Sequence, residues 1–311
     1  MRLLSSFNAV AAASLGLLLQ PSYALAQALE TVGKPIPYGT DHQPAATNIA
    51  RDLQWLDHMI HIIIGVIVLF VTVLLLYIIV RYAKKRNAVP ATFTHNSPLE
   101  VAWTIVPILV LVFIGSFSLP ALFEQQEIPV ADLTIKVTGN QWYWSYEYPD
   151  VKVGDDTLKF DAFRIDGATK IDDAAAGWGD DQPMSTAEVL SDVAVKKLAY
   201  FGYKKEDFLL ATDNAVVIPV GKTIVMQITG ADVIHAWAIP AFGVMQSAVP
   251  GRLGQLWFKA EQEGVYFGQC TNICGKDHAY MPITVKVVSQ AAYDAWIAQV
   301  TSTGNLRLAS N

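Results

Sequence analysis

The chain has 311 residues, of which 52% are hydrophobic and only 16% are charged, with 22 basic and 28 acidic side chains. A soluble domain has about 25% charged residues, so this composition indicates a component of a membrane. The acidic balance, without a basic stripe, argues against nucleic acid as a partner.

The first 26 residues predict a secretory signal peptide. Arg2 gives the positive start, residues 9–19 form a short apolar core, and residues 24–26 (Ala-Leu-Ala) form a small-residue cleavage site. The core is too short to span a bilayer, which disfavours an uncleaved anchor. Residues 27–54 lack periodicity and are expected to form an extended N-terminal arm.

Two uncharged apolar stretches follow, Ile62 to Val80 and Val101 to Phe123, and each is long enough to cross a bilayer. They predict a transmembrane hairpin over residues 55–124, with helices at about 55–82 and 98–123.

The loop between the two stretches sets the orientation of the hairpin. Its first half carries four basic residues, which are Arg81, Lys84, Lys85 and Arg86. By the positive-inside rule the loop lies in the cytoplasm and both hairpin ends lie outside, in agreement with the signal peptide. We therefore expect a multi-pass protein of a bacterial inner membrane, with the N-terminus and the C-terminal domain in the periplasm.

The second span opens with Ser97-Pro98-Leu99-Glu100. This pattern is typical of a capping box, with Ser97 as N-cap and Glu100 reaching back to it. A carboxylate at the cytoplasmic edge of a membrane helix is also a candidate for admitting protons. The residues favour the capping role and leave the second role open.

Residues 125–301 change to short alternating segments. The segment 133–138 alternates apolar and polar residues, which predicts a strand with one buried face. Similar strands are expected at 141–148, 208–219, 222–229, 233–239, 253–260, 264–269 and 282–288. Many short strands with Gly, Pro, Asn and Asp between them predict an all-β antiparallel sandwich or barrel.

Two parts of this domain depart from the strand pattern. Residues 150–206 are expected to be an insertion, with a surface loop at 155–181 and a helix that a capping box at 185–188 opens. Ser289 is expected to cap a C-terminal helix, and residues 302–311 are expected to form a tail.

Soft metal ligands gather in one loop. The only two cysteines of the chain, Cys270 and Cys274, are followed by His278 and Met281, and a second imidazole lies upstream at His235. Thiolate, imidazole and thioether suit copper, so we predict a copper site. A disulfide, or an exposed redox pair as in copper chaperones, is the alternative for two cysteines outside the cytoplasm.

The strand at 141–148 is strongly aromatic. Alternation places Trp142, Trp144, Tyr146 and Tyr148 on one face, where most of these rings should fill the core. A ring left exposed near the metal loop would suit an electron donor. From Glu124 onward there are 23 acidic and 15 basic residues, a net charge of minus eight. Such a surface would attract a basic partner or would simply keep the domain soluble, and charge alone does not separate the two.

These features together resemble subunit II of a bacterial haem–copper cytochrome c oxidase of the aa3 type. The resemblance rests on His235 followed by Cys270-x3-Cys274-x3-His278-x2-Met281, on Trp142-Tyr143-Trp144, and on the segment 98–104 (Pro-Leu-Glu-Val-Ala-Trp-Thr). It covers the signal, the hairpin, a cupredoxin-like head and the terminal helix. Quinol-oxidising relatives have a similar fold but lack these copper ligands.

The resemblance implies a binuclear copper A centre. Cys270 and Cys274 would bridge two copper ions, His235 and His278 would bind one each, and Met281 would be a weak ligand to one. The backbone carbonyl of Asn272 would complete the set. The implied function is to accept electrons from cytochrome c and to pass them to haem in subunit I, where oxygen is reduced to water with coupled proton translocation.

Further roles come with the resemblance. Trp142 would be the point where the electron enters, and Glu100 would lie at the mouth of a proton-uptake channel. The acids that match the family's docking face are Glu147, Asp161, Asp213 and Asp232. Subunit I, subunit III, membrane lipid and cytochrome c are the expected partners.

One residue departs from the family pattern. Asn272 stands where the family usually has a Glu that helps to bind Mg²⁺ or Mn²⁺ beside subunit I. A neutral amide is a poorer ligand for a hard cation, so we expect that ion to be weakly held or absent. The alternative function is a membrane-anchored copper chaperone or thiol-disulfide oxidoreductase that uses Cys270 and Cys274.

Overall fold

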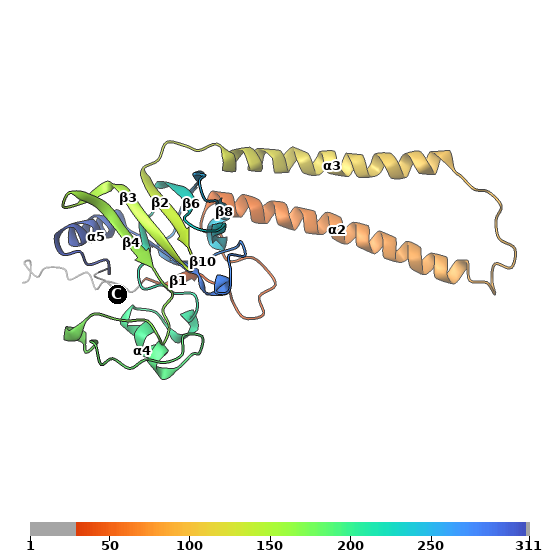
Figure 1. Ribbon diagram of the computed structural model, residues 1–311. Coiled ribbons are helices and arrows are strands. Elements are labelled where there is room, and N and C mark those ends of the chain that lie inside the picture. The colour runs from red at the N-terminus through yellow and green to blue at the C-terminus, as the bar shows by residue number, and fades with distance from the viewer. Residues whose placement is uncertain (1–28, 309–311) are drawn as a thin grey trace, which may run out of the picture.

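A computed structural model of the chain describes residues 29–308, a long helical hairpin attached to a β-rich head (Figure 1). The predicted signal peptide lies outside these residues. The hairpin helices α2 (Asn48–Arg81) and α3 (Ser97–Gln126) extend side by side away from the head. Both are long and apolar enough to cross a membrane, and their apolar side chains are largely exposed.

Helix α2 begins at Asn48 rather than near residue 55, because Thr47 is its N-cap. The buried Thr47 hydroxyl accepts a hydrogen bond from Ala50 N–H at 3.0 Å and donates one to the Phe242 carbonyl at 2.8 Å. Arg51, one turn further on, makes two hydrogen bonds to the carboxylate of Glu261, at 2.6 and 2.9 Å. The first turn of the helix is therefore fixed to the head.

The N-cap of α3 is Asn96, and the prediction of Ser97 was wrong by one position. Asn96 has extended backbone angles, and its side chain accepts a hydrogen bond from Leu99 N–H at 3.3 Å. Glu100 still reaches back, since its carboxylate accepts from Asn96 N–H at 3.0 Å. The capping role of Glu100 is thus confirmed with a different partner.

The head is a sandwich of two sheets. One has the order β1-β10-β11-β5 and the other the order β4-β3-β2-β6-β9, while β7 and β8 form a separate pair. The strands are β1 (Thr31–Gly33), β2 (Leu133–Asn140), β3 (Tyr143–Val153), β4 (Asp156–Ala162), β5 (Val216–Pro219), β6 (Thr223–Gly230), β7 (His235–Ile239), β8 (Val244–Ala248), β9 (Gly254–Lys259), β10 (Gly264–Gln269) and β11 (Pro282–Val288).

The sandwich confirms the predicted fold class, but the sheets are not purely antiparallel. Three pairs are parallel: β1 with β10, β2 with β6, and β5 with β11. Each joins segments far apart in the chain, which no local turn signal reveals. The short strand β1 comes from the predicted arm.

The region expected to be an insertion is partly strand. Its first part completes β3 and forms β4, which pairs with β3 along most of its length. The helix α4 (Asp192–Tyr200) begins after Ser191, which caps Ala194 N–H, rather than at the predicted box near Ser185. Of the strand expected at 208–219, only β5 forms. We use the name insertion lobe for residues 163–212, which lie beside the sandwich (Figure 1).

Aromatic side chains fill the space between the sheets. Trp144, Tyr146 and Tyr148 are fully buried, as their alternation predicts. Trp237 N–H donates to the Tyr146 hydroxyl at 3.2 Å, so the buried polar groups of both rings are paired. Helix α5 (Gln290–Thr303), capped by Ser289 as expected, packs Trp296 against this core.

A buried ammonium group holds the insertion lobe together. Lys197 of α4 is fully buried, and its Nζ donates to the carbonyls of Gly167 and Thr169 at 3.1 and 2.6 Å. Buried charges need such partners to offset the loss of hydration.

Replacing Lys197 by methionine should loosen the lobe by about 2–3 kcal/mol, since two buried carbonyls lose their donor. Limited proteolysis of the purified protein should then cut residues 163–212 faster than in the parent. Lys196→Met, an exposed neighbour, is the control. Equal cleavage of the two variants would contradict the structural role of Lys197.

Candidate metal centre

The metal loop, residues 270–281, connects β10 to β11. These strands are antiparallel neighbours, with Gln269 opposite Pro282. Cys270 N–H donates to the Met281 carbonyl at 3.1 Å and closes the base of the loop. The hydrogen bonds between β10 and β11 therefore fix both ends of the loop at one edge of the sandwich.

The two thiols face each other inside this loop. The Sγ atoms of Cys270 and Cys274 are 3.8 Å apart, far beyond the roughly 2.05 Å of a disulfide bond. Both residues are buried, with 2% and 4% of their surface exposed. The structure thus contradicts the disulfide, and the burial disfavours an exposed redox pair.

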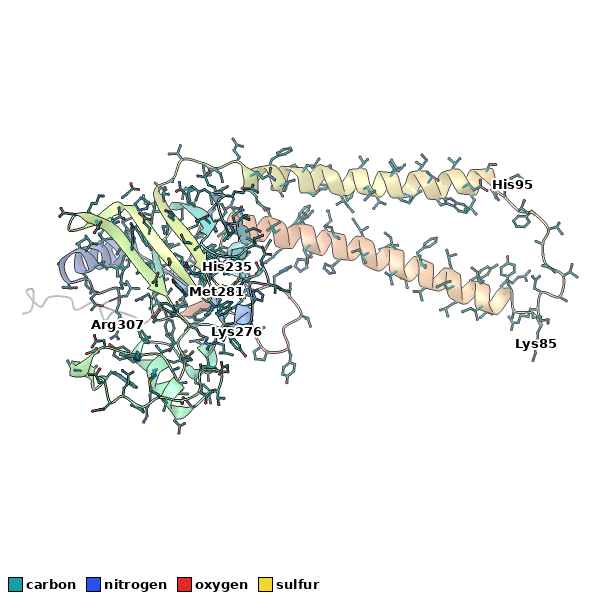
Figure 2. The ribbon with its side chains drawn as sticks, in the orientation of Figure 1. Lys85, His95, His235, Lys276, Met281 and Arg307 are labelled. Atoms are coloured by element: carbon teal, nitrogen blue, oxygen red, sulfur yellow. The ribbon has the colours of Figure 1, made fainter. Side chains whose placement is uncertain are left out.

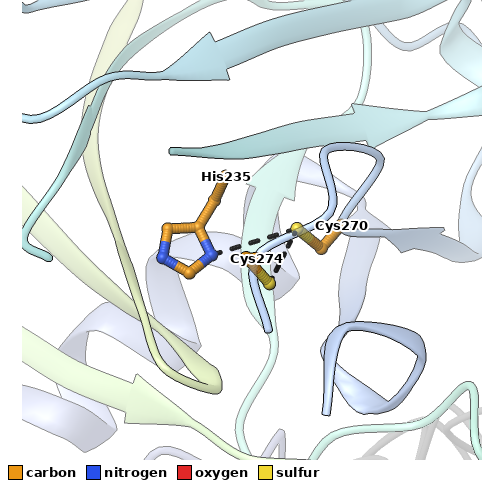
Figure 3. A group of neighbouring side chains, drawn as sticks. All are labelled: His235, Cys270 and Cys274. Atoms are coloured by element: carbon orange, nitrogen blue, oxygen red, sulfur yellow. Dashed lines mark hydrogen bonds between the residues drawn. The ribbon is translucent and has the colours of Figure 1, made fainter. Parts of the chain in front are cut away.

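His235 enters the site from β7 (Figure 3). Its Nδ1 lies 4.0 Å from the Cys270 sulfur, and its Nε2 lies 2.8 Å from a carboxylate oxygen of Asp232. A Cβ on Gly139 would lie 2.8 Å from the buried ring, so only glycine leaves room for it. Asp232 and Gly139 together orient the imidazole, as ligands of metals require.

The second half of the metal loop supplies two more donors. His278, at the start of the short helix η4 (His278–Tyr280), places its Nδ1 3.6 Å from the Cys274 sulfur. Met281 is buried in the same apolar cluster as the two cysteines. His235, Cys270 and Cys274 form the tightest group, whose ligand atoms all lie within 4.8 Å of one another.

Asn272 stands between the thiols and the β7–β8 pair. Its main-chain oxygen is 3.4 Å from the Cys270 sulfur. Its amide nitrogen lies 3.4 Å from the His235 carbonyl and 3.2 Å from the Ser247 hydroxyl. The side chain therefore links the metal loop to the neighbouring strands through hydrogen bonds.

The two thiols differ in their tendency to ionise. Burial opposes ionisation of Cys270, but hydrogen bonds from His235 and from backbone N–H groups outweigh it and lower the pKa to about 7. Burial and the neighbouring Cys270 thiolate raise the pKa of Cys274. A cation between the sulfurs would relieve this repulsion, since metal ions deprotonate the thiols that bind them.

These donors fit a copper centre. The two thiols lie beside the His235 and His278 rings and the Asn272 carbonyl, and Met281 is buried in the same cluster; soft ligands of this kind select copper. A mononuclear cupredoxin site needs only one thiolate, so a second facing thiol suits a shared pair of ions.

Comparison with known proteins decides the family. Residues 133–177 and 187–288 match the family "Cytochrome C oxidase subunit II, periplasmic domain", and residues 35–121 match its transmembrane domain. Cytochrome c oxidase subunit 2 of Cereibacter sphaeroides is 53% identical over 96% of this chain and 93% of its own length. The chain belongs to the cytochrome c oxidase subunit II family.

Two further similar proteins are a sequence relative and a solved structure. A probable cytochrome c oxidase subunit 2 from Rickettsia felis is 38% identical over 89% of this chain and 78% of its own length. The crystal structure of the periplasmic domain of subunit II of Bradyrhizobium japonicum is 40% identical and covers 57% of this chain and 98% of that chain, with a TM-score of 0.40. As a subunit II, the chain is part of an oxidoreductase complex, the haem–copper oxidase.

In this subunit II, Trp142 lies directly over the metal loop. Its indole N–H lies 3.3 Å from the Cys274 carbonyl, and the Gln141 amide donates to the same oxygen at 2.9 Å. A Cβ on Gly275 would lie 2.9 Å from the indole, so glycine allows this close approach. The Lys276 ammonium lies 5.5 Å from the ring centroid, and the ring is only partly buried.

The four predicted docking acids lie in different environments. Asp232 and Asp161 are exposed, although Asp232 also holds His235 and Gln141 N–H. Glu147 is half-buried between two lysines, each 3.6 Å away. Asp213 is half-buried and accepts a hydrogen bond from Phe163 N–H at 2.8 Å. Asp161 and Asp232 are thus the two most exposed, and Asp161 accepts a hydrogen bond from the Ser145 hydroxyl at 2.6 Å.

Glu100 is remote from the metal loop. It begins α3 at the end of the hairpin near His95, far from His235 and Met281 (Figure 2). Glu100 and the metal loop therefore lie at opposite ends of the described structure.

Sequence reasoning missed several groups that shape the site. Asp232 was expected only as a docking acid, although its position three residues before His235 is a usable signal for a partner of the ring. Gly139, Gln141 and Ser247 have no such signal, because only the folded sheets bring them to the metal loop.

The environment of Asp213 predicts how the stability of the fold changes with pH. Burial raises its pKa to about 6. The folded state therefore binds more protons than the unfolded state between about pH 4 and 6, and ionised Asp213 destabilises the fold increasingly as the pH rises through this window.

Asp213→Asn keeps an oxygen for Phe163 N–H and removes the charge. The variant should be more stable than the parent by about 1 kcal/mol at pH 8, and the difference should vanish towards pH 4. Thermal denaturation between these pH values measures it, with the exposed Asp155→Asn as control. A difference that grows on acidification would contradict the assignment.

Proposed function

We propose that this chain admits electrons to its oxidase, accepting them from cytochrome c at a pair of copper ions and passing them to haem in subunit I. There oxygen would be reduced to water with coupled proton translocation. The observation that carries the proposal is the pair of free, buried thiols 3.8 Å apart, each facing one imidazole nitrogen. The ligands would be His235, Cys270, Cys274, His278, Met281 and the Asn272 carbonyl.

When bound, the copper pair would share one electron between two metals, so that its geometry changes little on reduction. The chain itself would hold the ligand side chains in fixed positions and keep water away from them. The thiols are buried, the loop is closed at its base by the Cys270–Met281 hydrogen bond, and Asp232 holds the His235 ring. Such prior organisation limits the rearrangement that accompanies charge movement.

Trp142 is the proposed point of electron arrival. Its ring is partly exposed on one side and reaches the Cys274 carbonyl on the other, which gives one short route from the surface to a ligand. Glu147, Asp161, Asp213 and Asp232 would attract the donor.

The domain limits and topology follow the same proposal. Residues 1–26 would be removed as a signal peptide, the hairpin would lie against subunit I in the lipid, and the loop with Lys84 and Lys85 would face the cytoplasm. The head would lie in the periplasm. Glu100 would then lie at the cytoplasmic side, where protons are taken up, and subunit III would complete the assembly.

The magnesium or manganese site of the family remains predicted to be weak or absent. The amide nitrogen of Asn272 is engaged with His235 and Ser247, which leaves one neutral oxygen for a cation. Chaperone or thiol-exchange activity is disfavoured as the main role, because such work needs accessible sulfurs.

Cys274→Ser tests the copper pair. With one bridging thiolate lost, bound copper should fall from two ions per chain to at most one, and electron uptake from cytochrome c should be lost. Metal analysis and the EPR spectrum of the purified oxidase measure this. Thr271→Ser, an exposed neighbour in the same loop, is the control. Two copper ions with an unchanged spectrum in Cys274→Ser would refute the ligand assignment.

Trp142→Phe tests the point of electron arrival. It keeps a ring but removes the indole N–H that reaches Cys274, so electron uptake should slow at least about tenfold, equivalent to about 1.4 kcal/mol in activation free energy. Copper content and cytochrome affinity should not change. Trp257→Phe in the edge strand β9 is the control, and stopped-flow oxidation of cytochrome c is the measurement. An unchanged rate in Trp142→Phe would remove this ring from the route.

A further inference from the structure

A groove of about 630 Å³ separates Trp142 from the insertion lobe. One wall carries Trp142, Tyr143 and Tyr280, next to the metal loop. The opposite wall carries Lys170, Ala187 and Glu188, which belong to the lobe. The ring proposed to receive electrons therefore faces a second surface that the sandwich alone does not provide.

The lobe is fixed in this position. Arg164 stacks on Tyr280 of the metal loop, 4.5 Å from the ring centroid, and is held by Asp166 at 2.7 Å. Ser185 N–H donates at 3.0 Å to the Gly167 carbonyl, which also accepts from Lys197. The lobe is thus attached to the metal loop through Arg164 and Tyr280 and is held together internally by Gly167 and Lys197.

The outer segment of the lobe has a one-sided charge. Residues 171–195 contain six acidic and no basic side chains. Asp180, Asp181 and Glu188 are exposed, and none of them forms an ion pair within the described residues. Lys170 is a nearby basic side chain of the lobe and lines the same groove as Glu188, so the acids outnumber it and leave a net negative surface.

Apolar side chains accompany these acids. Met184, Val189 and Leu190 are 47%, 56% and 47% exposed. Val189 and Leu190 directly follow Glu188, which lines the groove. An apolar patch with a charged border is the usual composition of a protein–protein contact.

We propose that the insertion lobe is the second half of the docking surface for cytochrome c. The donor would lie across the groove, with its basic face against Asp180, Asp181 and Glu188 and its apolar contact on Val189 and Leu190. This proposal rests on the proposed electron-accepting function. The lobe would bind the donor, whereas Trp142 would receive the electron. A basic partner fits, because both the lobe and the whole head carry a net negative charge.

The charge and the apolar patch should act on different steps. Long-range attraction raises the rate of encounter and weakens with salt, whereas apolar contact slows dissociation and is insensitive to salt. The acids are therefore expected to set the association rate and the apolar pair the lifetime of the complex.

Two variants of the full oxidase separate these effects. One is Asp180→Asn with Asp181→Asn and Glu188→Gln, and the other is Val189→Ser with Leu190→Ser. The control removes three charges elsewhere, with Asp155→Asn, Asp156→Asn and Glu263→Gln. Asp155 precedes β4, Asp156 begins it, and Glu263 precedes β10, so these exposed acids lie at the strand ends away from Trp142 and the metal loop.

Reduced soluble cytochrome c of the mitochondrial type is the probe, in stopped flow from low to high ionic strength. The charge variant should lower the second-order rate constant about 3–10-fold at low salt and flatten its salt dependence. The apolar variant should raise the dissociation constant and keep the salt slope. Copper spectra and electron transfer within the preformed complex should match those of the parent.

Equal rates and salt slopes in the charge variant and in its control would overturn the docking role of the lobe, whatever Trp142→Phe does. A parent-like dissociation constant in the apolar variant would overturn the assignment of Val189 and Leu190. Failure of the proposed function has another signature, namely normal electron uptake by Trp142→Phe and Cys274→Ser. Unchanged proteolysis of the lobe confirms that each variant is folded.

Discussion

The antiparallel pairing of β10 with β11 is the constraint on which the site depends. Because Gln269 lies opposite Pro282, the twelve residues between these strands must fold back on themselves, and the Cys270–Met281 hydrogen bond closes their base. The two thiols therefore meet in the interior of one loop, and only the His235 ring has to come from another part of the chain.

Several residues contact both the metal loop and the outer surface beside it. The Cys274 carbonyl accepts from Trp142 and Gln141, and Gly275 allows the indole to lie against the loop. Asp232 holds both His235 and Gln141 N–H. The residues that orient the ligands are thus in contact with the surface where a donor would approach, so the metal loop and its outer face form one packed unit.

The proximity of Cys270, Cys274 and His278 was predictable because these residues lie in a single stretch of the chain, and their role as metal ligands stays a prediction. The hairpin was predictable because length and apolarity decide it. The parallel pairs of β2 with β6 and of β5 with β11 were not predictable, since they join distant segments. Asn96 displaced Ser97 as a cap because both residues can cap a helix and only the backbone angles distinguish them.

The attachment of α2 to the head has a mechanical consequence. Thr47 binds Phe242, and Arg51 binds Glu261, so no flexible linker separates the first membrane helix from the sandwich. A head joined in this way does not rotate independently of the helix. The tilt of α2 in the bilayer therefore sets the orientation of the head, and a binding partner would find the same face at the same distance from the membrane surface.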